Sequence, residues 1–333
     1  MPGRATIYDV ATEAGVSIST VSLVLNSPAR VSAGTRRRVL DAVDALGFVP
    51  KTDAVARARR GVGRIGVVGP HTSYATVARR VNGVLAAVAG RPLEVVLFDQ
   101  ESAATSSSPL LAGLPVTGRL DGLLVVSLPL EDGAAERLTG LGLPAVLVDV
   151  RHPGFDSVHA DDKAGGRLVA GHLLARGHRR LGFLGEAQRT GAYVSPSRRR
   201  LDGFRAALAE AGHGLPGGDV RFTVHGVGPA AEAAAAMLAG PERPTAVFAG
   251  DDVLAAGVVK AARGLGLRVP DDVAVAGFDD GELAEALELT TVRQPLEESG
   301  RAAMERLLQR LESPSAPARE IRLDLRLVER RTT

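Results

Sequence analysis

The chain has 333 residues, of which 45% are hydrophobic, and this length is sufficient for two or three folded units. It contains no cysteine, which excludes disulfides and thiolate metal sites and is typical of a reducing compartment. No apolar run reaches the roughly 18 residues that a membrane span needs, and the N-terminus does not have the pattern of a signal peptide. We therefore expect a cytoplasmic protein that does not contact the membrane.

The net charge of +2 is distributed unevenly along the chain. Residues 1–60 carry nine Arg or Lys against five Asp or Glu, a balance of +4, so the remaining residues sum to −2. A basic end on a slightly acidic body is typical of a protein that contacts nucleic acid with one end.

The N-terminal segment predicts two short helices joined by a turn. Thr6 with Asp9 three residues later is a capping pair that begins the first helix. Gly15 forms the turn, and Ser17 caps a second helix that runs to Asn26. Such a helix-turn-helix places the start of its second helix in the major groove of DNA.

A third helix is predicted from a Ser32 cap to a stop at Gly47. Each of the three helices has one apolar face at helical spacing, so we expect them to enclose a small core. Its members are Ile7, Val10, Ala11, Ala14, Val21, Val24, Leu25, Val39, Val43 and Leu46.

After residue 61 short apolar runs alternate with alanine-rich helical stretches. This alternation predicts an α/β body of parallel sheets covered by helices on both faces, and its length indicates two sheets. The expected strands are 65–68, 93–97, 122–126, 145–148, 181–184, 220–224, 246–249 and 273–276. The expected helices are 75–89, 132–141, 163–176, 198–211, 229–239, 252–265 and 296–311.

Three patterns that elsewhere indicate enzymes or metal sites are not favoured here. The glycines of Gly61–Gly66 match a dinucleotide motif, but they precede their strand, and we interpret them as a linker. His152 and His159, or Asp161 and Asp162, lack metal-ligand spacing and are interpreted as solvated loop residues. No catalytic triad or nucleophile elbow is recognisable, so we expect no enzyme activity, no metal and no cofactor.

The segment from Thr6 to Asn26 closely resembles the DNA-binding head of the lactose-repressor (LacI/GalR) family of bacterial transcription regulators. The shared residues are Asp9-Val10-Ala11, Ala14-Gly15-Val16-Ser17, Thr20-Val21-Ser22 and Val24-Leu25-Asn26. Phrases of the family recur through the body, among them Asp121-Gly122-Leu123-Leu124, Arg200-Leu201-Asp202-Gly203-Phe204 and Gly277-Phe278-Asp279-Asp280.

The resemblance implies a particular domain organisation. Residues 1–60 would form the head, with a hinge helix at about 50–60, and residues 61–333 a two-lobed domain for effector binding and dimerisation. The body would have the fold of a periplasmic binding protein, with a ligand cleft between two similar lobes. Some family members carry an additional C-terminal helix that builds tetramers. This sequence ends soon after Arg326–Arg330, so we expect a homodimer.

By this resemblance, the base-facing positions of the second helix are Ile18, Ser19 and Leu23. Ile18 and Leu23 can contact thymine methyl groups but cannot form hydrogen bonds with bases. The expected phosphate contacts are Ser17, Thr20, Ser22, Asn26, Ser32 and Thr35, with Arg30 and Arg36 adding charge and Thr6 and Ile7 completing the DNA-binding set. For each serine and threonine, simple helix capping is an alternative role.

Residues 48–60 resemble the hinge helix of the family, which enters the minor groove at the centre of a palindrome. Lys51, Ala54 and Arg57 are its expected DNA contacts. Arg57 stands where the family has a leucine wedge that kinks the DNA, and Lys51 replaces the usual asparagine. Arginine is attracted to the minor groove but does not unstack bases, which leaves the kink open, with Val55 as the alternative wedge.

The resemblance places effector contacts at Asp149, Arg200, Asp279 and Gln294, with Phe248 as a stacking face. Carboxylates accept hydrogen bonds from hydroxyl groups and arginine donates them in pairs, which indicates a sugar or a related polyol. The alternative is that Arg200 and Asp279 only pair with each other across the lobes.

These observations predict a ligand-responsive transcriptional regulator, most often a repressor in this family. It would bind double-stranded palindromic operator DNA as a dimer and respond to a small effector, expected to be a carbohydrate. The alternatives are a sugar-binding protein of transport type and a Rossmann-like enzyme. A signal peptide would favour the first alternative and a correctly placed glycine loop the second, and the sequence has neither.

Overall fold

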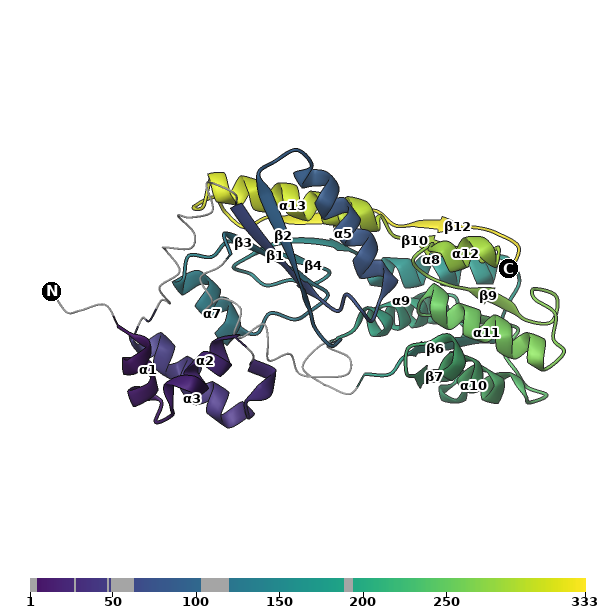
Figure 1. Cartoon of the computed structure of the whole chain (residues 1–333). Helices are drawn as coiled ribbons and strands as arrows, with labels where there is room; N and C mark the ends of the chain where they lie inside the picture. Colours follow the sequence, from purple (N-terminus) through teal and green to yellow (C-terminus); the bar gives the residue numbers. More distant parts are fainter. Residues whose placement is uncertain (1–4, 27, 47, 49–62, 103–119, 189–193) are drawn as a thin grey trace. The chain divides into compact units, whose positions relative to one another are not determined.

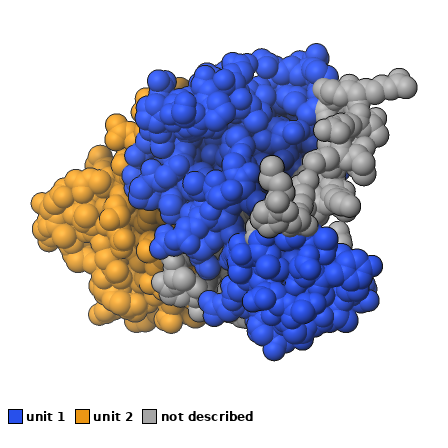
Figure 2. Space-filling view, turned by 90° about the vertical axis from the view of Figure 1, so that its left-hand side faces the viewer, with its two compact units in different colours: residues 1–159, 297–321 blue, residues 160–296, 322–333 orange. Residues whose placement is uncertain are grey.

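The computed structural model describes residues 5–26, 28–46, 48, 63–102, 120–188 and 194–333 (Figure 1). The chain divides into two compact units (Figure 2). Unit 1 comprises residues 1–159 and 297–321, and unit 2 comprises residues 160–296 and 322–333. The predicted head boundary at residue 60 lies outside the described residues and stays a prediction.

The N-terminal segment folds into α1 (Ile7–Glu13), α2 (Ile18–Asn26), a short 3-10 turn (Pro28–Arg30) and α3 (Ala33–Leu46) (Figure 1). The three predicted helices are therefore confirmed. The predicted apolar faces form one core, with Phe48 as an additional member that the sequence did not indicate. Its buried residues are Val10, Ala11, Ala14, Val21, Val24, Leu25, Val39, Leu40, Ala42, Val43 and Phe48.

Side-chain caps fix the starts of these helices. The Thr6 hydroxyl accepts from the Asp9 amide at 3.4 Å, and the Asp9 carboxylate accepts from the Thr6 amide at 2.7 Å. This reciprocal capping box satisfies two donors that the first turn leaves unpaired. Ser17 and Ser32 each accept from the amide three residues later, at 3.1 and 3.4 Å. All three predicted helix starts are confirmed.

The first α/β unit contains a six-stranded sheet of order β11-β5-β4-β3-β1-β2. The pairs β1·β2, β1·β3, β3·β4 and β4·β5 are parallel. Strands β3 and β4 are buried at every position, as expected where helices cover both faces. The strands are β1 (Gly63–Gly69), β2 (Leu93–Asp99), β3 (Gly122–Val126), β4 (Ala145–Val148), β5 (Asp156–Ala160) and β11 (Glu320–Leu323), and the helices are α5 (Ala75–Val88), α7 (Asp132–Gly140) and α13 (Leu296–Glu312).

Unit 2 contains a four-stranded parallel sheet of order β7-β6-β8-β9 and a small antiparallel pair, β10·β12. The strands are β6 (Leu181–Glu186), β7 (Val220–Thr223), β8 (Ala246–Ala249), β9 (Ala274–Ala276), β10 (Thr291–Arg293) and β12 (Arg326–Val328). The helices are α8 (Asp162–Ala175), α9 (Pro196–Glu210), α10 (Val227–Leu238), α11 (Asp252–Gly264) and α12 (Glu282–Ala286).

Both sheets reverse their strand order at an equivalent point. In each, the first strand lies between the second and the third, so the order changes direction at β1/β3 and at β6/β8. In open parallel sheets, ligands bind beyond the carboxyl ends of the strands at such a switch point. A ligand site is therefore expected among the residues that follow β3, β4, β6, β8 and β9.

The two predicted parallel sheets are confirmed, with corrections at particular elements. Strands β5, β10, β11 and β12 and helix α12 were not predicted. The linker interpretation of Gly61–Gly66 is wrong from Gly63 onward, because Gly63 begins β1 and pairs with Leu93. A Cβ at Gly66 would lie 2.7 Å from Leu120 Cδ1, the end of a flexible side chain that would have to shift. Gly61 and Val62 lie outside the described residues.

No helix among the described residues is both long and apolar enough to cross a membrane.

Candidate DNA-binding and effector sites

The start of α2 presents apolar side chains to solvent. Ile18 is 41% exposed and Leu23 is 38% exposed, while Val21 and Val24 on the opposite face are fully buried. Exposing two large aliphatic side chains on a short helix has no benefit for the fold, because their burial would be favourable. They are available for contact with another apolar surface, such as thymine methyl groups.

The structure also exposes Tyr8, which the sequence analysis did not select. Its side chain on α1 is 66% exposed, more than any other large hydrophobic residue among those described. The available signal was its place on α1 outside the buried positions Val10, Ala11 and Ala14. A phenol on this surface can contact a phosphate through its hydroxyl.

Most of the predicted polar DNA contacts lie on the surface of the head. The exposed members of the predicted set are Thr6, Ser17, Ser19, Arg30 and Ser32, and the partly buried ones are Ile7, Thr20, Ser22, Thr35 and Arg36. Capping, the alternative role, is confirmed for Thr6, Ser17 and Ser32. Their DNA contacts stay predictions.

Four predicted DNA contacts cannot be placed. Lys51, Ala54 and Arg57 lie outside the described residues, as does Val55, the alternative wedge. Asn26 ends α2, but its side chain is not described.

In unit 2, a buried arginine organises a polar cluster at the ends of the strands. The Arg200 side chain, on α9, is 8% exposed. It donates to the Asp162 carboxylate at 2.9 Å and to the Gly250 carbonyl at 2.5 Å. Burial lowers the pKa of Arg200, but the negative charges of Asp162 and Asp279 outweigh it and raise the pKa overall. The guanidinium is therefore a permanently charged group in a buried position.

Asp279 joins two further predicted effector residues to this cluster. Its carboxylate lies 3.8 Å from Arg200 Nη1 and accepts a hydrogen bond from Gln294 Nε2 at 2.5 Å. Its backbone φ of 111° lies in a region that residues other than glycine rarely adopt. A backbone held in this way is common where a side chain must be aimed at a ligand.

Arg200 and Asp279 do pair, at 3.8 Å, but the alternative that they pair across the two lobes is wrong. Both residues lie in unit 2, and the shorter contact of Arg200 is with Asp162. Asp162, interpreted from sequence as a solvated loop residue, is instead buried in the first turn of α8, where it also pairs with Arg199 at 3.0 Å.

His159 is a second correction of the same kind. It lies in β5 with its side chain buried, and Nε2 is 3.1 Å from the Glu320 carboxylate. Among the residues that the structure describes, no group of three or more His, Asp or Glu side chains is arranged to hold a metal ion.

Asp252 is an acid of the cluster whose pKa is strongly shifted. It is buried at the start of α11, where it accepts from Thr291 Oγ1 at 2.6 Å and from the Gly281 amide at 2.9 Å. Burial raises its pKa to about 8, and the neighbouring Asp279 carboxylate also raises it. The protonated form of Asp252 is therefore favoured in the folded protein.

A His–Asp pair that was not predicted from the sequence lies beside these residues. His225 Nε2 lies 3.3 Å from the Asp251 carboxylate. Burial lowers the pKa of His225, but the hydrogen bond to Asp251 and the charges of Asp251 and Glu186 raise it overall. The available signal was position, because Asp251 and His225 closely follow the predicted strands β8 and β7.

The structure does not expose Phe248 as a surface on which an effector could stack, contrary to the prediction. It is fully buried in β8, with ring centroids 5.2 Å from Phe204 and 5.4 Å from Phe183. The structure assigns it to the core of unit 2, because β8 is a central strand with helices on both sides. The ring next to the Arg200 guanidinium is instead Phe278, 3.7 Å from the guanidinium carbon to the ring centroid.

Asp149, the remaining predicted effector residue, lies in unit 1. It directly follows β4 with a φ of 64°, and Ser127 directly follows β3 with a φ of 54°. The Ser127 hydroxyl donates to Asp149 Oδ2 at 2.7 Å, and Arg80 Nη2 lies 2.7 Å from the same oxygen. Neither Arg80 nor Ser127 was among the effector residues predicted from the sequence.

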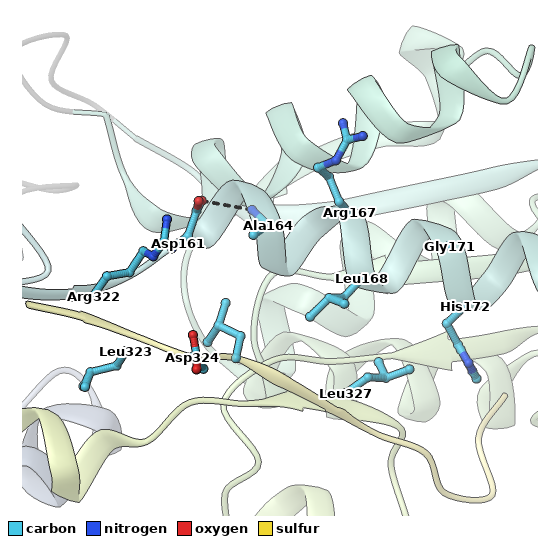
Figure 3. Close-up of a pocket in the computed structure, with 11 residues that line it drawn as sticks. Asp161, Ala164, Arg167, Leu168, Gly171, His172, Arg322, Leu323, Asp324 and Leu327 are labelled. Carbon is cyan, nitrogen blue, oxygen red and sulfur yellow. Dashed lines mark hydrogen bonds between the residues drawn. The ribbon is translucent and has the colours of Figure 1, made fainter.

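A separate cavity of about 690 Å³ lies in unit 2 between α8 and the C-terminal segment. Figure 3 shows Leu168 pointing from α8 toward that segment, while Arg167 points away from it. Two of the charged groups of its rim are already engaged: Arg167 pairs with Glu210, and Asp161 caps α8. We assign no function to this cavity.

The fold and the two polar clusters define a class of protein. A helix-turn-helix head accompanies two α/β units, each of which carries an ion-paired cluster at the carboxyl ends of its strands. A family model described as "Bacterial regulatory proteins, lacI family" matches residues 6–51. A second model, "Periplasmic binding protein-like domain", matches residues 170–333. The class is therefore a DNA-binding transcriptional regulator that responds to a ligand.

Whole-length relatives identify the family. The chain is 31% identical to the HTH-type transcriptional repressor PurR of Photobacterium profundum, over 98% of each chain. It is 33% identical to the ribose operon repressor of Escherichia coli (strain K12), over 98% of this chain and 99% of that protein. The chain belongs to the lacI family of bacterial regulatory proteins.

Solved structures agree with this family over the whole chain. A transcriptional regulator CelR–cellobiose complex has a TM-score of 0.72 and 30% identity, covering 99% of this chain and 100% of that one. The lac repressor dimer bound to operator and the anti-inducer ONPF has a TM-score of 0.70 and 28% identity, covering 99% of each chain.

Proposed function

We propose that this regulator represses transcription by binding a palindromic operator as a homodimer, and that a carbohydrate effector bound at the Arg200–Asp279–Gln294 cluster controls this binding. It would act in the cytoplasm, where the operator DNA lies, and would have no enzyme activity. Relatives that are named repressors, and a structural neighbour described as a dimer on operator, support this proposal. One helix-turn-helix in each chain requires two chains for a two-fold operator.

The observation that carries the effector proposal is the Arg200–Asp279–Gln294 arrangement. Arg200 and Gln294 bring donors to Asp279, whose carboxylate is an acceptor. Vicinal hydroxyl groups of a sugar ring both donate and accept, so such an array can bind them. The cluster lies beyond the carboxyl ends of β8 and β9, near the switch point of the unit 2 sheet. Neighbours described with bound cellobiose or ribose support this ligand class.

In the head, we propose that Ile18, Ser19 and Leu23 contact base edges. The serine, threonine and arginine residues of the predicted set would contact phosphates, and Tyr8 would join them. Lys51, Ala54 and Arg57 stay predicted minor-groove contacts. We also propose that Asp149 contributes to effector binding. A transport protein that only binds sugar would not need the exposed apolar surface of α2, which a DNA-binding protein can use to contact bases.

The test begins with selection of operator sequences from random DNA, which should return an inverted repeat. Operator binding is then measured by fluorescence anisotropy with a panel of ribose, glucose, maltose and cellobiose. At least one sugar should shift the operator affinity of the wild-type protein, because an effector acts through its different affinities for two states.

Arg200→Ala should weaken the response to that sugar by about thirtyfold or more, since it removes a buried charged donor. Operator affinity without sugar should stay near the wild-type value, because the head is unchanged. Arg205→Ala is the matched control, since Arg205 is exposed on the same helix. A normal sugar response in Arg200→Ala would place the effector site elsewhere.

A further inference from the structure

Two segments of the chain share a short motif that the sequence analysis did not detect. Arg79-Arg80-Val81-Asn82-Gly83 lies in α5, and Arg199-Arg200-Leu201-Asp202-Gly203 lies in α9. Each helix follows the first strand of its sheet, β1 or β6. From residue 76 to 90 and from 196 to 210, every position has the same degree of burial, whether buried, half-buried or exposed. Arg80 and Arg200 therefore occupy equivalent positions in their units.

In unit 1, a glycine-mediated helix contact holds the backbone at Arg80. A methyl group added at Gly83 would overlap the Glu297 carbonyl of α13, and one added at Gly300 would overlap the Arg80 carbonyl. Because two helices can approach this closely only where side chains are absent, each glycine accommodates the backbone of the other helix.

The same reciprocal contact recurs in unit 2. A methyl group at Gly203 would overlap the Lys163 carbonyl of α8, and one at Gly166 would overlap the Arg200 carbonyl. In both units, the crossing point thus lies at the carbonyl of the buried arginine. The helix backbone that carries each guanidinium group is therefore fixed in the same way in both units.

Each arginine then reaches a carboxylate that follows a strand with positive φ. The Arg80 side chain is 5% exposed, and Nη2 is 2.7 Å from Asp149 Oδ2. Nη1 donates to the Thr76 carbonyl at 3.2 Å, which orients the planar group. The Ser127 hydroxyl donates to the same Asp149 oxygen at 2.7 Å. This arrangement corresponds to Arg200 with Asp279 in unit 2.

A purely structural role explains this arrangement less well. A buried ion pair contributes little net stability compared with an apolar pair of similar volume, because both charges must lose their hydration. The left-handed backbone conformation at Asp149 and Ser127 is a further cost. Costs of this kind are typical of sites that bind ligands.

We propose that Arg80 is the unit 1 counterpart of Arg200. It is a positioning residue that, together with Ser127, holds the Asp149 carboxylate in the orientation in which it accepts hydrogen bonds from the hydroxyl groups of the effector. This inference rests on the proposed function and adds a second arginine–carboxylate pair to the residues that recognise the sugar.

The test uses the full-length protein and the same panel of ribose, glucose, maltose and cellobiose. The readout is the sugar concentration that half-shifts operator binding. Asp149→Asn and Arg80→Leu should each raise this concentration at least about tenfold, and the double variant should be no worse than Asp149→Asn alone. Arg80→Lys should restore part of the response, because it keeps the charge but not the planar fork.

Arg79→Ala is the matched control. Arg79 precedes Arg80 on α5 but forms a surface ion pair with Glu297 at 2.7 Å, so its removal should leave the sugar response unchanged. If Arg80→Leu does not fold, the inference is tested with Arg80→Lys alone. This variant should need a several-fold higher sugar concentration than the wild type to half-shift operator binding.

The outcomes separate the two proposals. If no sugar shifts operator binding by the wild type, the carbohydrate effector and this inference are both wrong. If Arg200→Ala loses the response while Arg80→Leu keeps it, only this inference is overturned. If Asp149→Asn also keeps the response, the proposed contribution of Asp149 to effector binding is overturned as well. Losses that add in the double variant would show that Arg80 acts on stability rather than through Asp149, and would also overturn the inference.

Discussion

The protonated state of Asp252 predicts an unusual pH dependence of stability. The pKa is raised from 3.8 to about 8 in the folded protein, so the folded state binds this proton more tightly than the unfolded state. The contribution of Asp252 to stability is therefore fully present below about pH 4 and is lost as the pH rises toward about 8. Each pH unit between these limits removes about 1 kcal/mol, so the loss from about pH 5 to 8 is a few kcal/mol.

Asp252→Asn removes the titrating group while keeping nearly the same shape. The measurement is the free energy of unfolding of both proteins, from urea titrations followed by circular dichroism at several values between about pH 5 and 8. The asparagine variant should gain stability relative to the wild type as the pH rises. Groups distant from Asp252 titrate alike in both proteins and cancel in the difference, whereas Asp279, which is coupled to Asp252, contributes to it. A difference that stays constant with pH would refute the reasoning.

Two further predictions concern packing and charge. Gly203→Ala should destabilise unit 2 by about 1–3 kcal/mol, because the added methyl group would overlap the Lys163 carbonyl. The control is Gly171→Ala on α8, where an added methyl group meets no neighbour. This variant should be neutral or stabilising by up to about 1 kcal/mol. Equal thermal shifts for the two variants would contradict this. Asp156→Ala should cost about 3–5 kcal/mol, because the side chain is 1% exposed and balances two arginines of α13. A thermal midpoint close to the wild-type value would contradict this second prediction.

The parallel strands were predictable because their composition carries the signal. A strand buried on both faces consists of apolar residues, and Gly122–Val126, Ala145–Val148 and Ala246–Ala249 have the predicted bounds. Strand β5 was not predictable in this way, because it begins with Asp156. The carboxylate is accommodated there by Arg306 and Arg310 of α13, about 150 residues later in the chain.

The effector cluster was predictable only in part, for a related reason. Resemblance to the family indicated Arg200, Asp279 and Gln294, and the structure brings these three together in unit 2. Asp162, the shortest carboxylate contact of Arg200, was interpreted as a loop residue because a single sequence does not show which acid folds against which base. The same limit concealed the His225–Asp251 pair.

Arg80 shows how a site residue can be hidden from motif analysis but evident from packing. The two helical segments share only two arginines and a glycine at equal spacing, and such a match is weak in sequence alone. In three dimensions, the glycines set the closest approach of each helix pair, and that approach lies at the carbonyl of the second arginine. Because the crossing fixes the backbone and the strand end fixes the carboxylate, little freedom remains for the side chain between them. The same small-residue contact that packs the helices therefore also determines where each guanidinium meets its acid.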